Sequence, residues 1–128
     1  MFSIERHVVG SYRTNCYVLT SAGQAIVIDP GDEGDRLIRE LGEADVSHIV
    51  LTHCHSDHIG AVNELAERYG AIVCVGRDDA VGVADPHLSG FDEEGSDYRV
   101  ERVDRLLDDG DALAWGEDRL EVIATPGH

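Results

Sequence analysis

The fold of this chain is decided by Thr52-His53-Cys54-His55-Ser56-Asp57-His58. An apolar run ending at Leu51 precedes this stretch, and apolar residues at helical spacing follow it from Ile59 to Tyr69. The stretch therefore marks the place where a buried strand turns into a helix. Because side chains alternate along an extended chain, we expect His53, His55 and Asp57 to share one face, with His58 at the start of the helix.

Three imidazoles and a carboxylate fall within six residues of this stretch. Packing explains such a density poorly, because a core would have to give each buried polar group a partner, and the sequence shows none. We therefore interpret His53, His55, Asp57 and His58 as metal ligands. Neutral imidazoles and carboxylate oxygens suit zinc, and also iron or manganese, better than calcium.

Two other predicted strand ends carry residues of the same kind. Val27-Ile28-Asp29-Pro30-Gly31 ends an apolar strand with an acid and a turn. Ala124-Thr125-Pro126-Gly127-His128 ends another strand with a histidine. The sequence leaves two roles open for Asp29, either a turn or helix-capping residue or a residue that orients a metal ligand from behind.

In the order and type of these pieces, the chain resembles the metallo-β-lactamase fold superfamily, whose motif is His-x-His-x-Asp-His with a third histidine on a later loop. The resemblance covers essentially the whole chain. It implies an α/β fold of the αββα sandwich type, of which residues 1–128 would form one domain portion, the N-terminal half, with a mixed sheet and helices packed outside. The C-terminal half, which in the family supplies a bridging carboxylate and a further histidine, is expected to be absent.

The resemblance also implies the roles of the site residues. His53, His55 and His128 would hold a first metal ion, while Asp57 and His58 would hold a second one beside it. A hydroxide bound to metal would attack a carbonyl, because a metal lowers the pKa of its water from 15.7 to roughly 7. Asp57 would be catalytic, orienting the hydroxide and later carrying its proton.

Asn15-Cys16-Tyr17 makes the chain most similar to the glyoxalase II-like group, the hydroxyacylglutathione hydrolases. This similarity implies a zinc-dependent thioesterase acting on a small acyl thioester. A second reading is a persulfide dioxygenase-like enzyme with a single iron ion. A third, from another class, is a non-catalytic remnant that holds one zinc ion for folding.

The remaining pattern predicts the elements around these motifs. Strands are expected near 2–9, 15–20, 25–28, 46–51, 71–75, 100–103, 112–115 and 120–124, and helices at 33–41, 59–69 and 78–83. Gly42 should end the first helix. The isolated His7, His48 and His87 are expected to be surface residues.

Composition narrows the class of protein further. The chain has 128 residues, and no apolar run long enough to cross a bilayer or to serve as a secretion signal, so we expect a cytoplasmic protein of one domain. Its three cysteines form no Cys-x-x-Cys pair, which indicates reduced thiols, with Cys16 and Cys74 as small core residues.

The acidic composition of the chain argues against polyanionic partners. The net charge is −16, and all ten basic residues are arginine. An acidic surface of this strength repels nucleic acid and anionic membranes, so a small-molecule substrate is expected instead. Abundant acids without lysine also indicate adaptation to high salt. The alternative is an acidic surface combined with codon usage that favours arginine.

High salt is expected to stabilise this protein. Molar salt shortens the reach of repulsion between surface carboxylates to roughly 3 Å, which removes a force that opposes the compact state. Thermal melts across a salt series should therefore show a Tm that rises with salt concentration. Equal stability in dilute buffer and in molar salt would contradict the adaptation.

Overall fold

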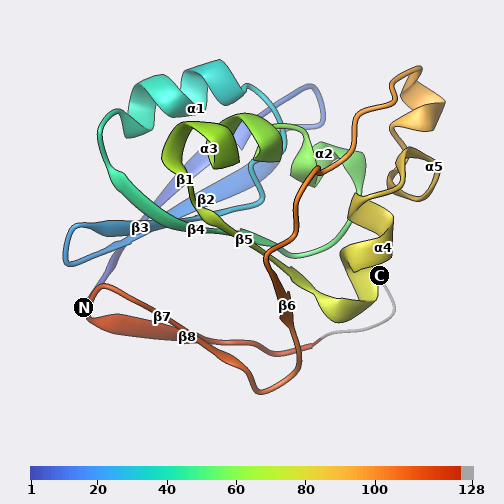
Figure 1. Cartoon of the computed structure of the whole chain (residues 1–128). Helices are drawn as coiled ribbons and strands as arrows, with labels where there is room; N and C mark the ends of the chain where they lie inside the picture. The colour runs from blue at the N-terminus through green and yellow to red at the C-terminus, as the bar shows by residue number, and fades with distance from the viewer. Residues whose placement is uncertain (125–128) are drawn as a thin grey trace.

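The computed structural model describes residues 1–124 (Figure 1). Its strands are β1 (Ser3–Val9), β2 (Thr14–Ser21), β3 (Gln24–Ile28), β4 (Asp45–Leu51), β5 (Ile72–Gly76), β6 (Arg105–Leu107), β7 (Ala112–Trp115) and β8 (Asp118–Glu121). Its helices are α1 (Gly34–Leu41), α2 (Ser56–Ile59), α3 (Val62–Tyr69), α4 (Ala80–Val83) and α5 (Pro86–Ser89), with 3-10 turns at Arg77–Asp79 and Asp92–Glu94.

A mixed sheet organises these elements. Its strand order is β1-β2-β3-β4-β5-β6, antiparallel from β1 to β3 and parallel from β3 to β6. Parallel neighbours need a crossover, which α1 provides between β3 and β4, and which α2 and α3 provide between β4 and β5. The carboxyl ends of β3, β4 and β5 therefore meet at one edge, where open α/β sheets commonly bind ligands.

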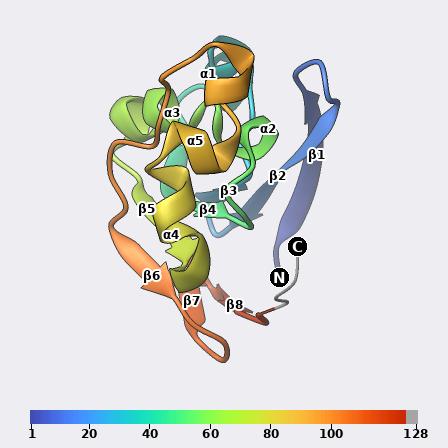
Figure 2. The same cartoon turned by 90° about the vertical axis from the view of Figure 1, so that its right-hand side faces the viewer.

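Both faces of the sheet are apolar and covered. On one face α1 and α3 pack through the fully buried Leu37, Val62 and Leu65. On the other face the β7–β8 hairpin packs through Leu113 and Trp115, and the indole Nε1 of Trp115 donates to the Leu19 carbonyl at 3.1 Å. Figures 1 and 2 show the helices and the hairpin on opposite sides of the sheet. Coverage of both faces explains why β3 reads as a continuous apolar run.

The predicted α/β architecture, a mixed sheet with helices packed outside, is confirmed. The strands expected at 15–20, 25–28 and 46–51 form within one residue of those bounds, and α1 ends at Gly42 as expected. Cys16 and Cys74 are fully buried, and all three thiols are free. No helix within residues 1–124 is long and apolar enough to cross a membrane.

The continuous helix predicted over 59–69 is wrong. Helical turns begin at Ser56, stop at Ile59 and resume at Val62. The interruption has a clear cause: the Gly60 amide donates to the Gly31 carbonyl at 3.0 Å, and the Ala61 amide donates to the Pro30 carbonyl at 2.9 Å. These amides bond to the loop after β3 rather than to the preceding helical turn, so the helix divides into α2 and α3.

Two strand predictions near the end of the chain are also corrected. The strand pattern that leads from 100–103 towards Leu106 and Leu107 forms a strand only from Arg105, as β6, because Val100 donates its amide to the Val83 carbonyl at 2.9 Å and is held beside α4. The last strand is Asp118–Glu121 rather than 120–124, because Trp115 pairs with Asp118 across a tight turn. Strand β8 therefore starts immediately after that turn.

Candidate metal centre

Four of the predicted ligands, His53, His55, Asp57 and His58, lie where β3 and β4 end. Asp29 follows β3 directly, and its amide donates to the Val50 carbonyl of β4 at 3.0 Å. The Asp29 side chain is buried, with a relative exposure of 4% for the residue. The histidine-rich stretch follows Leu51, the last residue of β4. Parallel pairing of these two strands therefore brings the acid and the histidines to the same edge.

Asp29 fixes the position of His58. Its Oδ1 accepts the Thr52 amide at 2.8 Å, its Oδ2 accepts the Thr52 hydroxyl at 2.5 Å, and Oδ2 lies 3.0 Å from Nδ1 of His58. Because a carboxylate accepts, Nδ1 carries the proton of this contact, and Nε2 is the nitrogen that faces Asp57. Metal-binding histidines are commonly oriented from behind in this way. Asp29 caps no helix, since the residue at the N-cap of α1 is Glu33.

The hydrogen bond that His58 donates to Asp29 also raises the pKa of His58, and the charge of Asp57 acts in the same direction against the opposing effect of burial. Nε2 of His58 lies 3.3 Å from Oδ2 of Asp57. The two residues assigned to a second metal ion are thus adjacent in space as well as in sequence.

The three imidazoles of the stretch pack together. The ring centroids of His53 and His58 lie 3.9 Å apart, and those of His53 and His55 lie 4.9 Å apart. One ligand atom from each of Asp29, His53 and His58 falls within 4.8 Å of the others. The donor types suit a transition metal ion such as zinc, with the two histidines as ligands, because both Asp29 oxygens already accept from Thr52 and His58.

The expectation that His53, His55 and Asp57 share one face of an extended segment is wrong. His55 is extended but occupies the N-cap of α2, and Asp57 lies inside that helix. Asp57 and His58 are therefore presented by a helical turn, and His53 and His55 by the loop before it. His128 lies outside residues 1–124, so its predicted role stays a prediction.

Sequence reasoning missed two threonines that contact the acids of this centre. Thr52 binds Asp29 through both its amide and its hydroxyl. The buried Thr14 donates its hydroxyl to Oδ2 of Asp57 at 2.8 Å. A signal for Thr14 existed: it shares the core-facing side of β2 with Cys16 and Val18, and a polar group there needs a partner.

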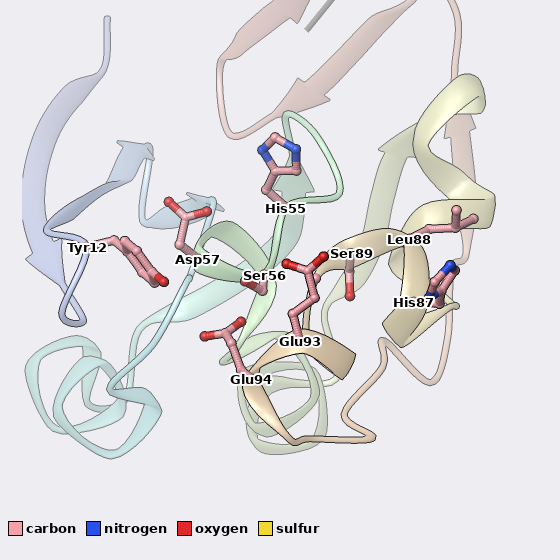
Figure 3. Close-up of a pocket in the computed structure, with 10 residues that line it drawn as sticks. Tyr12, His55, Ser56, Asp57, His87, Leu88, Ser89, Glu93 and Glu94 are labelled. Carbon is pink, nitrogen blue, oxygen red and sulfur yellow. The ribbon is translucent and has the colours of Figure 1, made fainter.

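A polar cavity of about 340 Å³ opens beside the centre (Figure 3). His55 and Asp57 line it from one side, and Tyr12, Glu93 and Glu94 come from the β1–β2 turn and from Asp92–Glu94. The exposed His87 also lines this cavity. It is a surface residue, as expected, and its Nδ1 lies 3.4 Å from Oδ2 of Asp92. His7 and His48, in contrast, are half-buried rather than exposed.

Replacing Asp29 with asparagine should weaken metal binding by about 10- to 100-fold, the usual effect of removing a partner that orients a ligand. An amide cannot accept from Thr52 and His58 on both of its atoms, so the His58 ring loses its fixed orientation. Zinc affinity, measured by competition with a chelator, checks this. The matched control is Asp45→Asn, at the opposite end of β4; equal affinities for the two variants would contradict the role of Asp29.

The sequence is similar to known proteins along nearly its whole length. The sequence profile of the metallo-beta-lactamase superfamily matches residues 9–128. The chain is 35% identical over 127 residues to YqgX of Bacillus subtilis, a probable metallo-hydrolase, covering 96% of this chain and 60% of that protein. It is 28% identical over 136 residues to GloC of Haemophilus influenzae, a hydroxyacylglutathione hydrolase, covering 98% of this chain and 62% of that protein.

Solved structures of metallo-beta-lactamases are also similar to this chain. The crystal structure of BLEG-1 B3 metallo-beta-lactamase is 30% identical, with a TM-score of 0.89 over 98% of this chain and 62% of that chain. BJP-1, a subclass B3 metallo-beta-lactamase of Bradyrhizobium japonicum, is 28% identical, with a TM-score of 0.73 over 89% of this chain and 46% of that chain. The chain thus spans about 60% of the two curated relatives described above.

Proposed function

This chain belongs to the metallo-beta-lactamase superfamily, and from that premise we propose that it carries the metal-binding centre of a hydrolase that attacks an acyl carbonyl. One observation supports this most strongly: Asp29 holds His58 by Nδ1, the His53 ring lies against His58 with centroids 3.9 Å apart, and the His55 ring lies against His53. Such an arrangement gathers imidazole nitrogens beside a cavity that His55 and Asp57 line, and a transition metal ion takes donors of this kind.

In this proposal His53, His55 and His128 hold one metal ion, and Asp57 and His58 hold a second one. A bound metal ion of this kind supplies a water that ionises near neutral pH and an electrophile for the carbonyl. Asp57 orients the reacting water and carries a proton on its carboxylate, while Asp29 keeps the His58 ring in one orientation. Zinc is the proposed metal, and iron or manganese would accept the same donors.

We propose a small acyl thioester, of the glyoxalase II type, as the substrate. GloC and a relative from Bradyrhizobium that is 32% identical over 110 residues are both hydroxyacylglutathione hydrolases, which supports this choice. A β-lactam is the second candidate, because the fold is similar to that of BLEG-1. We also propose a cytoplasmic protein that binds neither nucleic acid nor membranes, in keeping with the net charge of −16.

Metal analysis and paired assays of the full-length protein test this function. The proposal predicts two zinc ions per chain and hydrolysis of acyl thioesters, with little turnover of β-lactams. A single iron ion with oxygen-dependent persulfide turnover would favour the dioxygenase reading. One tightly held zinc ion without any turnover would favour the non-catalytic remnant.

A further inference from the structure

We propose that Thr14 is a positioning residue that sets the orientation of the Asp57 carboxylate in the metal centre. The inference rests on the proposed function, since it takes Asp57 as a metal ligand and proton carrier. It starts from one contact between distant parts of the chain: the Thr14 hydroxyl donates to Oδ2 of Asp57 at 2.8 Å across 43 residues of sequence.

Thr14 is well suited to hold a second group in place. Its relative exposure is 6%, and as the first residue of β2 it pairs with Val9 of β1. Three residues further along, Tyr17 already pairs with Ile28 of β3. A buried hydroxyl on a residue that is paired to β1, in a strand that β3 also pairs from Tyr17 onward, has little freedom to move, and sites supported by strands are held more accurately than sites on loops.

The contact selects one oxygen of the carboxylate. Oδ2 of Asp57 receives the Thr14 hydroxyl and also lies 3.3 Å from Nε2 of His58. Within residues 1–124, both recorded contacts of this carboxylate fall on Oδ2. Oδ1 is therefore the oxygen that stays available to a metal ion or a proton. Figure 3 shows the Asp57 carboxylate between Tyr12 and His55 at the side of the cavity.

Thr14 and Asp29 each hold one member of the Asp57–His58 pair. Asp29, after β3, binds Nδ1 of His58, and Thr14, at the start of β2, binds Oδ2 of Asp57. Each support is buried, and each precedes the histidine-rich stretch in sequence. The short helix α2 is thus oriented by two polar contacts from neighbouring strands of one sheet.

The test compares zinc affinity of the full-length protein and its variants by competition with a chelator. Thr14→Val keeps the shape of the side chain and removes the hydroxyl, so zinc binding at the site that uses Asp57 should weaken by about 10- to 100-fold. Thr14→Ser restores the donor and should return the affinity to within about threefold of the parent. Thr20→Val, on the same strand, is the matched control and should change nothing.

Thermal melting of the metal-free variants separates positioning from stability. If Thr14→Val lowers Tm but binds zinc normally, Thr14 is merely structural and the inference is wrong. Asp57→Asn serves as the reference for the proposed function. If that variant also binds zinc normally, the metal role of Asp57 fails; if it loses zinc while Thr14→Val does not, only the role of Thr14 fails.

Discussion

The substitution His55→Ala is expected to reduce kcat/KM for hydrolysis by at least about 100-fold. Loss of a partner that only orients a ligand reduces metal affinity or activity by about 10- to 100-fold, and loss of a proposed ligand should exceed that range. His55 is exposed at the N-cap of α2 and lines the cavity, so its removal should leave the fold intact. The measurement is kcat/KM together with zinc content per chain.

His87→Ala is the matched control for His55→Ala. The His87 side chain is 81% exposed and lines the same cavity, but its Nδ1 lies 3.4 Å from Oδ2 of Asp92, and the ring contacts of the cluster join His53, His55 and His58. Its removal should leave zinc content unchanged. A His55→Ala variant that keeps its zinc and its turnover would contradict the hydrolase mechanism proposed above.

Gly31→Ala is expected to give the largest loss of stability, about 3 kcal/mol or more in the free energy of unfolding. A Cβ built on Gly31 would lie 1.8 Å from the Asp57 carbonyl oxygen, a backbone atom that has no alternative rotamer. Relief requires the loop after β3 to separate from α2. That movement breaks the bond from the Gly60 amide to the Gly31 carbonyl, which holds Asp57 and His58 in place.

Chemical denaturation of Gly31→Ala and of Gly76→Ala measures this difference. A Cβ on Gly76 meets nothing within 4 Å, and its backbone conformation is open to other residues, so that variant should stay within about 1 kcal/mol of the parent. Zinc affinity should fall together with stability in Gly31→Ala and should stay unchanged in Gly76→Ala. Equal stability of Gly31→Ala and Gly76→Ala would contradict this expectation. It would mean that the fold does not require the close approach of the Gly31 and Asp57 backbones.

Most of the sheet, and the clustering of the histidines of the candidate centre, could be predicted from sequence. Apolar runs predicted β2, β3 and β4 within one residue, because a strand pattern is carried by consecutive residues of the chain. The clustering of histidines after Leu51 was visible for the same reason, since these residues are neighbours in the chain. The division between α2 and α3 was not visible, because the apolar spacing continues through Gly60 and the interrupting bonds come from Pro30 and Gly31.

The supporting contacts of the centre could not be predicted, because each joins residues far apart in sequence. Thr14 reaches Asp57 over 43 positions, and Asp29 reaches His58 over 29. Strand pairing sets these distances, and a single sequence does not specify which polar groups meet across paired strands. Burial of a polar side chain on a core-facing position, as at Thr14, was the one local sign available.

Anomalous diffraction at the zinc edge, from crystals of the zinc-loaded full-length protein, tests the central claim most directly. The account predicts a zinc peak at about 2.0–2.1 Å from ring nitrogens of His53, His55 and His128, with a second peak beside Asp57 and His58. Zinc bound elsewhere, with the His128 ring far from the other two, would contradict the proposed centre and the hydrolase function that rests on it.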